Sequence, residues 1–172
     1  MQCLRYIVPI LILLCCGPVA AAQAPHSPEI MHYVRNHLSH SGILKSSDGF
    51  LYVDIDDAYI HKLISFIHEE GFKEPPYFGK PGLVGAHISV IYYDEANNYG
   101  LGEVEEFGKL IIFTPKQCQV VHPPKWKETE SLYLITVEAP ELDRIRKKYG
   151  LPRREYEFHI TVGIKPKMSK AA

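Results

Sequence analysis

The sequence lacks an excess of charge of either sign. Lys and Arg total 19 and Asp and Glu total 20 of its 172 residues, which gives a formal net charge of −1. Proteins that bind a long nucleic acid or an anionic membrane surface need a basic surface, because many phosphates must be contacted at once. The composition therefore argues against a long nucleic acid as the partner, and any anionic ligand has to be held locally.

A long apolar run is also missing. Residues 1–22 contain Arg5, an apolar run from Tyr6 to Cys16 and then small residues, an order typical of a secretory signal peptide. The run is shorter than a membrane-spanning helix requires. We expect cleavage at the alanines of positions 20–22, export to the periplasm or the medium, and a single domain of residues 23–172 that is not membrane-bound. An uncleaved membrane anchor is the alternative.

Cysteine is scarce, and cleavage would leave only Cys118. A single cysteine cannot form an internal disulfide, so the exported domain must be held together by packing alone. A lipid anchor on Cys15 or Cys16 is a competing interpretation, although the small residue that should precede the modified cysteine is missing. Cys118 lies in the strand-like run 116–121, where we expect it to be buried and unreactive.

Apolar periodicity and turn residues predict alternating strands and helices along the chain. In chain order, the expected elements are a helix from Pro28 that ends before Gly42, a strand 50–55, a helix from Asp56 to Gly71, a strand at 87–90, a polar turn at Asn97-Asn98, a hairpin of 109–113 and 117–121, a strand 131–137, a helix 140–149 and a strand 158–163.

The order strand, helix, loop, strand occurs twice, first from residue 50 to 90 and again from residue 131 to 163. Two such units in one domain predict an α+β fold that is bilobal and pseudo-twofold, with two antiparallel-rich sheets flanking a central cleft and the helices outside.

Each unit ends in nearly the same short motif, His87-Ile-Ser-Val90 in the first and His159-Ile-Thr-Val162 in the second. Alternate residues of a strand point to the same side, so each motif presents one imidazole and one hydroxyl together while its apolar residues face the core. The loose pattern His-x-Ser also occurs at His37, but there the context is helical and no apolar residue follows.

Two imidazoles and two hydroxyls on equivalent strands suit phosphodiester chemistry. A neutral His can remove a proton from the attacking oxygen and a protonated His can donate one to the leaving oxygen, since the ordinary pKa of about 6.5 lets both forms coexist near neutrality. The hydroxyls can donate hydrogen bonds to the nonbridging oxygens. This chemistry needs no metal or cofactor, and the motifs contain no obvious metal-ligand cluster.

These residues resemble the signatures of the two-histidine (2H) phosphoesterases, and the resemblance extends over most of the chain after the signal segment. It implies a bilobal α+β fold with one motif in each lobe. It also implies activity on 2′,3′-cyclic phosphates, 2′-5′ RNA linkages, RNA ends or cyclic oligonucleotides. By position, His87 and His159 would be the catalytic acid–base pair, and Ser89 and Thr161 would bind the phosphate.

The expected substrate is a small nucleotide or a short RNA-derived phosphodiester, most simply a cyclic one, bound by a monomer. Tyr93 is the best aromatic candidate for substrate binding and Lys165 the best cation, whereas Arg153 and Arg154 are expected to be solvated. One alternative is a noncatalytic nucleotide-binding or RNA-binding module, and another is an activity of the 2′-5′ RNA ligase type.

Overall fold

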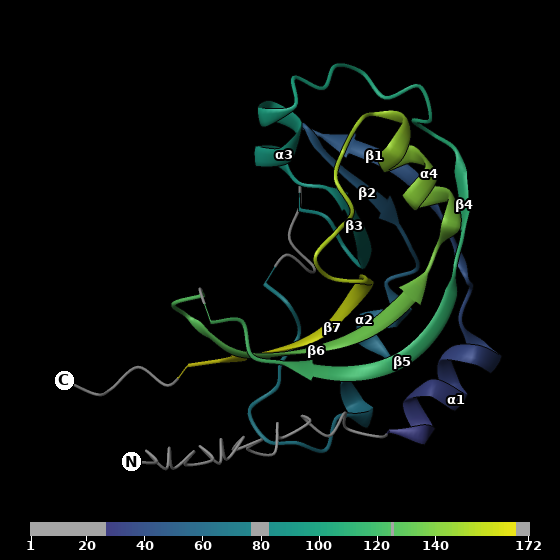
Figure 1. The fold of residues 1–172 in the computed structure, drawn as a ribbon. Helices are drawn as coiled ribbons and strands as arrows, with labels where there is room; N and C mark the ends of the chain where they lie inside the picture. The colour runs from purple at the N-terminus through teal and green to yellow at the C-terminus, as the bar shows by residue number, and fades with distance from the viewer. Residues whose placement is uncertain (1–26, 77–82, 125, 168–172) are drawn as a thin grey trace, which may run out of the picture.

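The computed structural model describes residues 27–76, 83–124 and 126–167, and Figure 1 shows their arrangement. The expected signal peptide, residues 1–22, lies outside the described residues, so its cleavage and the export of the chain stay predictions. Within the three described ranges, no helix is both long enough and apolar enough to cross a membrane.

The fold is α+β, as predicted, with helices distributed around one antiparallel sheet. The helices are α1 (Pro28–His37), α2 (Ala58–His61), α3 (Tyr93–Asn98), α4 (Pro140–Lys148) and the short 3-10 helix η1 (Ile64–Phe66). The strands are β1 (Ser41–Ser47), β2 (Phe50–Asp54), β3 (His87–Ile91), β4 (Leu110–Ile112), β5 (Thr114–Val121), β6 (Thr129–Glu138) and β7 (Phe158–Pro166).

The strands form one seven-stranded sheet with the order β4-β1-β2-β3-β7-β6-β5, so the prediction of two separate sheets was wrong. The two predicted units are joined at the centre of the sheet, where β3 and β7 pair at Ile88 and Ile160. Both units have the predicted course, since a helix links β2 to β3 and another links β6 to β7. The pseudo-twofold relation between them stays a prediction.

The two edge strands of the sheet, β4 and β5, are consecutive in the chain. Only Phe113 separates them, so the sheet has to curve round until its opposite edges meet, and Figure 1 shows β4 running directly into β5. The predicted hairpin of 109–113 and 117–121 was therefore wrong. The segment between these runs has no glycine or asparagine for a tight turn, and an edge strand tolerates Pro115 because its missing N–H is not needed there.

Two helices were predicted well because their end signals are local. The Ser27 side chain accepts a hydrogen bond from the Ile30 N–H at 3.4 Å at the start of α1, and Pro28 occupies its first turn. In α4, Pro140 again begins the helix and Leu142 and Ile145 are buried, as their spacing predicted.

The helix expected from Asp56 to Gly71 is instead broken into α2 and η1. Asp57 occupies the N-cap position of α2, but its side chain makes no capping hydrogen bond. Its Oδ1 accepts a hydrogen bond from the Ala86 N–H at 2.8 Å, next to the first His motif. A Cβ at Gly85 would lie 2.2 Å from that Asp57 oxygen, so the glycine before the motif is required by packing.

Other departures involve residues that normally mark turns. Gly42 does not follow a helix directly but lies in β1, where a Cβ would come within 2.3 Å of the Asp54 backbone oxygen. The expected polar turn at Asn97-Asn98 is the end of α3.

The core lies on the face of the sheet that carries Ile88, Val90, Ile160 and Val162, each fully buried. Helical residues such as Ile60 and Leu142 belong to the same buried cluster. Cys118 is 4% exposed in this core, which confirms its expected burial. Burial raises the pKa of its thiol to about 11, which favours the protonated, less reactive form.

Candidate active site

The two predicted motifs meet at the centre of the sheet. Because β3 and β7 are antiparallel and Ile88 pairs with Ile160, one further step of register sets His87 beside Thr161 and Ser89 beside His159. All four side chains point to the face opposite the buried isoleucines, which we call the histidine face. The two histidines occupy diagonal positions on it, for which side-chain origins lie about 7–8 Å apart.

Burial follows the same alternation. His87, Ser89, His159 and Thr161 are half-buried, whereas the residues between them are buried. Half-buried imidazoles and hydroxyls on a sheet face can reach a ligand while their backbones remain fixed in the sheet.

Both imidazoles are held in the same way. Nδ1 of His87 lies 2.8 Å from the Gly85 carbonyl oxygen, and Nδ1 of His159 lies 2.9 Å from that of Glu157. A carbonyl oxygen only accepts, so each Nδ1 carries the proton and donates it. In the neutral ring the lone pair is then on Nε2, and the same tautomer is set at both sites by a carbonyl two residues earlier.

Burial is the main cause of lowered pKa values at both histidines. It lowers the pKa of His87, against the opposing effects of the Gly85 carbonyl and Asp54. It also lowers the pKa of His159, where Arg154 and His87 lower it further and only the Glu157 carbonyl raises it. Both imidazoles are therefore mainly neutral at pH 7 in the free protein.

The neighbouring strands extend the histidine face on both sides. On β2, Asp54 pairs with His87 and Tyr52 with Ser89. On β6, Thr136 pairs with His159 and Leu134 with Thr161. The first pair of neighbours brings a carboxylate and a ring, and the second brings a hydroxyl and an apolar side chain.

A group of aromatic rings lies beside His87, and its two members on β2 were not predicted from the sequence. The ring centroid of Phe50 lies 5.7 Å from that of His87 and the Tyr52 centroid lies 6.0 Å from it, both edge to face. Tyr92 continues the group, with its ring 6.1 Å from that of Phe50. Alternation along β2 could have suggested Phe50 and Tyr52 as a pair, but not their place beside His87.

Arg154 lies close to the same site, although its position near a turn predicted a solvated side chain. It is half-buried, its Nη1 donates to the Ser89 carbonyl oxygen at 2.5 Å, and its guanidinium lies 4.8 Å from the Phe158 ring centroid and 5.5 Å from that of Tyr92. The guanidinium therefore approaches the backbone of the first motif and adds positive charge near His159.

A buried ion pair between Arg146 and Glu95 stabilises the segments next to the first motif. Arg146 is 4% exposed and binds Glu95 through two nitrogens, at 2.7 and 3.1 Å. It also donates to the carbonyl oxygens of Val90 at 2.8 Å and Pro152 at 3.0 Å. One side chain of α4 thus ties together the end of β3, α3 and the segment that carries Arg154.

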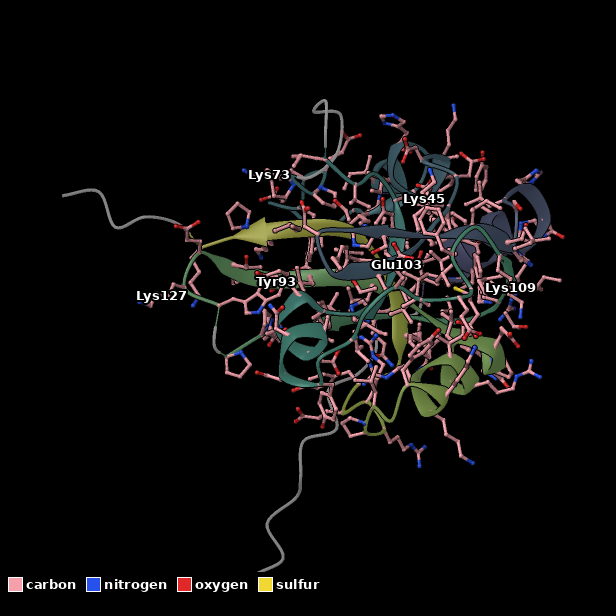
Figure 2. The ribbon with its side chains drawn as sticks, turned by 90° about the horizontal axis from the view of Figure 1, so that it is seen from above. Lys45, Lys73, Tyr93, Glu103, Lys109 and Lys127 are labelled. Atoms are coloured by element: carbon pink, nitrogen blue, oxygen red, sulfur yellow. The ribbon has the colours of Figure 1, made fainter. Side chains whose placement is uncertain are left out.

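The two substrate-binding candidates from the sequence lie elsewhere. Tyr93, labelled in Figure 2, is 60% exposed at the start of α3, and its ring lies 3.3 Å from where a Cβ on Gly49 would be, over the β1–β2 turn. Lys165 forms ion pairs with Glu130 at 3.3 Å and Glu69 at 3.4 Å. Neither has a described contact with the four motif residues, and their role in binding stays a prediction.

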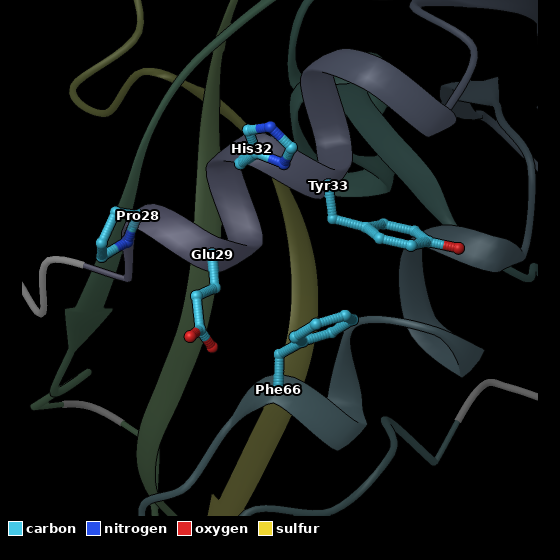
Figure 3. Close-up of a pocket in the computed structure, with 5 residues that line it drawn as sticks. All are labelled: Pro28, Glu29, His32, Tyr33 and Phe66. Atoms are coloured by element: carbon cyan, nitrogen blue, oxygen red, sulfur yellow. The ribbon is translucent and has the colours of Figure 1, made fainter.

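A surface pocket lies between α1 and η1, away from the motifs. Its lining residues are Pro28, Glu29, His32, Tyr33 and Phe66, and Figure 3 shows the rings of Tyr33 and Phe66 next to one another. Across the three described ranges, no three His, Cys, Asp or Glu side chains are placed to hold a metal ion.

A match over most of the chain gives its family. A model of the 2H phosphoesterase domain named Swiss Army Knife, 2H-SAK, matches residues 51–169, which include both motifs, Asp54 and Arg154. The chain belongs to the 2H phosphoesterases. The match begins within β2, so α1 and β1 of this 2H phosphoesterase precede the matched region. No curated protein and no solved structure gave a match.

Proposed function

We propose that this 2H phosphoesterase is a metal-independent phosphodiesterase in which His87 and His159 are the acid–base pair. One observation carries the proposal. The two rings stand diagonally on one face of the sheet, and each is fixed by an Nδ1–carbonyl hydrogen bond, at 2.8 Å for His87 and 2.9 Å for His159. In the neutral rings both lone pairs are on Nε2, the atom that a general base or acid would use.

Proton transfer would divide between the two rings. A neutral imidazole takes the proton of the attacking oxygen, and an imidazolium gives its proton to the leaving oxygen. The lowered pKa values favour two neutral rings in the free protein. An anionic phosphodiester bound between them favours the charged form of a ring and raises its pKa, so the substrate itself promotes the protonation that the reaction needs.

Ser89 and Thr161 are proposed to hold the phosphate. Each is two residues after a histidine and on the same face, so its hydroxyl can donate to a nonbridging oxygen while the histidines act on the attacking and leaving oxygens. The Arg154 guanidinium adds positive charge at the same end of the sheet.

A small nucleotide or short RNA-derived phosphodiester, most simply a cyclic one, fits this arrangement. The polar site is confined to the middle of the sheet and the net charge of the chain is −1, so a long strand would find few phosphate contacts. We also propose that the protein is exported through its N-terminal segment and that it works as a monomer. The two strand–helix–strand units are proposed to be related by a pseudo-twofold axis where β3 and β7 pair.

The test is product release from a panel of nucleoside 2′,3′-cyclic phosphates, cyclic dinucleotides and 2′-5′-linked oligonucleotides, with EDTA present. The double variant His87→Ala/His159→Ala is assayed beside the natural protein, and circular dichroism checks its fold. Turnover in EDTA that disappears in the folded double variant is the expected result, and it names the substrate class. Binding by calorimetry without turnover of any compound would overturn the proposal and favour a noncatalytic nucleotide-binding module.

A further inference from the structure

The carbonyl that orients His87 belongs to a peptide unit whose N–H is held by a side chain. The Gly85 carbonyl oxygen accepts from Nδ1 of His87 at 2.8 Å, and the Ala86 N–H donates to Oδ1 of Asp57, also at 2.8 Å. The carbonyl of Gly85 and the N–H of Ala86 are the two ends of one planar peptide unit. A carboxylate, a peptide and an imidazole are therefore joined in one chain of hydrogen bonds.

The Asp57 carboxylate does not serve its own helix. Asp57 occupies the N-cap position of α2 without a capping hydrogen bond. The Ala58 N–H at the start of this helix donates instead to Oδ1 of the neighbouring Asp56, at 2.9 Å. The two adjacent carboxylates thus have different tasks, and that of Asp57 is directed to Ala86 in a distant part of the chain.

The segment that contains Asp57 also holds the other polar group of Ala86. The Ile55 N–H donates to the Ala86 carbonyl oxygen at 3.1 Å. Because β2 ends at Asp54, these two hydrogen bonds continue its contact with the chain just before β3. Ala86 is 1% exposed, so its N–H has little access to water and depends on the carboxylate as its acceptor.

The contact leaves no space for a side chain at Gly85. A Cβ there would be 2.2 Å from Oδ1 and 3.0 Å from Cγ of Asp57. The carboxylate therefore packs directly against the backbone that carries the Gly85 carbonyl, and a glycine at this position is what permits the hydrogen bond.

We propose that Asp57 is a positioning residue for His87, on which it acts through the Gly85–Ala86 peptide. The hydrogen bond to Oδ1 fixes the plane of this peptide, so its carbonyl points at Nδ1 and keeps the proton there, with the lone pair of the neutral ring on Nε2. A charged acceptor at the N–H also polarises the peptide and makes its carbonyl a stronger acceptor. The inference rests on the proposed function, in which Nε2 of His87 transfers the proton.

The second motif holds the corresponding peptide in another way. The Glu157 carbonyl accepts from Nδ1 of His159 at 2.9 Å, and the next residue, Phe158, already lies in β7 and pairs with Val137 of β6. In the first motif the peptide comes before β3, which begins at His87 itself. A side chain thus holds the first peptide, whereas the second lies where two strands pair. His159 is therefore an internal reference for any change at Asp57.

The tautomer of each ring can be measured without a substrate. Nitrogen-15 chemical shifts of the imidazoles are recorded at about pH 8, well above the ordinary histidine pKa of about 6.5. Both His87 and His159 should carry the proton on Nδ1. Asp57→Ser keeps a residue that favours a helix start, but its shorter side chain does not reach Ala86. We expect His87 in this variant to become a mixture of both tautomers and His159 to stay unchanged. Asp57→Asn, whose amide oxygen can still accept from Ala86, should keep the Nδ1–H form at both rings.

The rate should follow the tautomer. Loss of the partner that orients a metal-binding histidine costs about 10-fold to 100-fold, and we expect the lower value, about 10-fold in kcat, for Asp57→Ser, with KM changed less than about 3-fold. Asp57→Asn should stay within about 3-fold of the natural kcat. Asp56→Ser is the matched control, because the adjacent carboxylate bonds only its own turn, and it should keep the natural rate.

The outcomes separate this inference from the proposed function. Urea unfolding shows whether each variant is folded, and Asp57→Thr, which has the same short reach, replaces Asp57→Ser if that variant is not. An unchanged tautomer of His87 in the short variant, an equal change at His159, or an equal loss of kcat in Asp56→Ser would overturn the role of Asp57. No turnover by the natural protein would overturn the proposed function, and the tautomers would still decide whether Asp57 positions His87.

Discussion

The β1–β2–β3 half of the sheet and the β5–β6–β7 half present the same chemistry in different surroundings. Each places a histidine whose Nδ1 donates to a carbonyl two residues earlier, followed two residues later by a hydroxyl. The first half surrounds its histidine with rings and the Asp54 carboxylate. The second offers Thr136 and, at the junction of the halves, Arg154.

This difference separates two kinds of information in the sequence. The features shared by the halves are those that the proposed acid–base pair would need in duplicate, namely the imidazole, its tautomer and the hydroxyl. The features that differ come from other segments: Asp54 and the rings from β2 on one side, and Thr136 from β6 with Arg154 on the other.

Apart from the loss of a motif histidine, the largest effects should come from replacing the two hydroxyls, Ser89 and Thr161. These variants test whether the two halves contribute equally to phosphate binding. Removing one preorganised hydrogen-bond donor to a transition-state oxygen typically costs about 100-fold to 1,000-fold in kcat. We expect Ser89→Ala and Thr161→Ala each to lose about 100-fold, measured as kcat on the substrate found in the panel. Thr114→Ala, at an exposed position of β5, is the matched control and should keep its rate. A loss confined to one hydroxyl would show that the halves bind phosphate unequally.

The next effect is on stability and concerns the ion pair of Arg146 with Glu95, next to the end of β3. Arg146→Met should lower the free energy of unfolding by about 3 kcal/mol, because it leaves Glu95 without its buried partner and frees the carbonyls of Val90 and Pro152. Lys148→Met removes the same charge two residues later on the exposed side of α4 and should lower the free energy of unfolding clearly less, because its ion pairs with Glu105 and Glu106 are exposed to solvent. Urea unfolding measures both, and equal losses would contradict a special role for the buried pair.

Arg154 and Lys165 can be compared by the effect of their replacement on KM. Arg154→Met should raise KM about 10-fold if the guanidinium also reaches the bound phosphate, since a charge-assisted hydrogen bond is worth about 1.5–3 kcal/mol. Lys165→Met should change KM less than about 3-fold, because Glu130 and Glu69 already pair with its ammonium. Steady-state kinetics on one substrate distinguishes the two, and a larger effect of Lys165→Met would restore it as the substrate-binding cation.

The smallest effect is the pH dependence of stability. Burial lowers the pKa of His87 and of His159, so the unfolded chain binds more protons than the folded one at mildly acid pH. The free energy of unfolding should therefore fall as the pH drops below about 6.5, the ordinary pKa of histidine. The double variant His87→Asn/His159→Asn should show a weaker fall in urea titrations. An unchanged pH dependence would contradict the lowered pKa values.

Helix-capping residues and apolar spacing were sufficient to predict two helices and the two motif strands. Ser27 with Pro28, and Pro140 with the spacing of Leu142 and Ile145, marked α1 and α4 correctly, and alternation marked the two motif strands. Which strands pair was not accessible in the same way. The continuity of β4 and β5 and the pairing of β3 with β7 at Ile88 and Ile160 depend on how the whole sheet curves.

The same distinction applies to the site. The motifs themselves could be read from alternation, because a strand places its own residues i and i+2 on one side. Asp54, Phe50 and Arg154 could not, since their place depends on the register between β2 and β3 and on a hydrogen bond from Arg154 to Ser89, far away in the chain. Tyr93 was predicted by extending the strand alternation of His87 and Ser89 to position 93, but β3 ends at Ile91 and α3 begins at Tyr93, so the alternation does not reach it.

The most direct test of the acid–base pair is kcat for His87→Ala and His159→Ala, measured separately on the substrate found in the panel. His122→Ala is the control, because this exposed histidine bonds Ser131 and Glu130 beyond the site. The account predicts a loss of about 100-fold or more for each motif histidine and an unchanged rate for the control. Full activity in either His87→Ala or His159→Ala would contradict it.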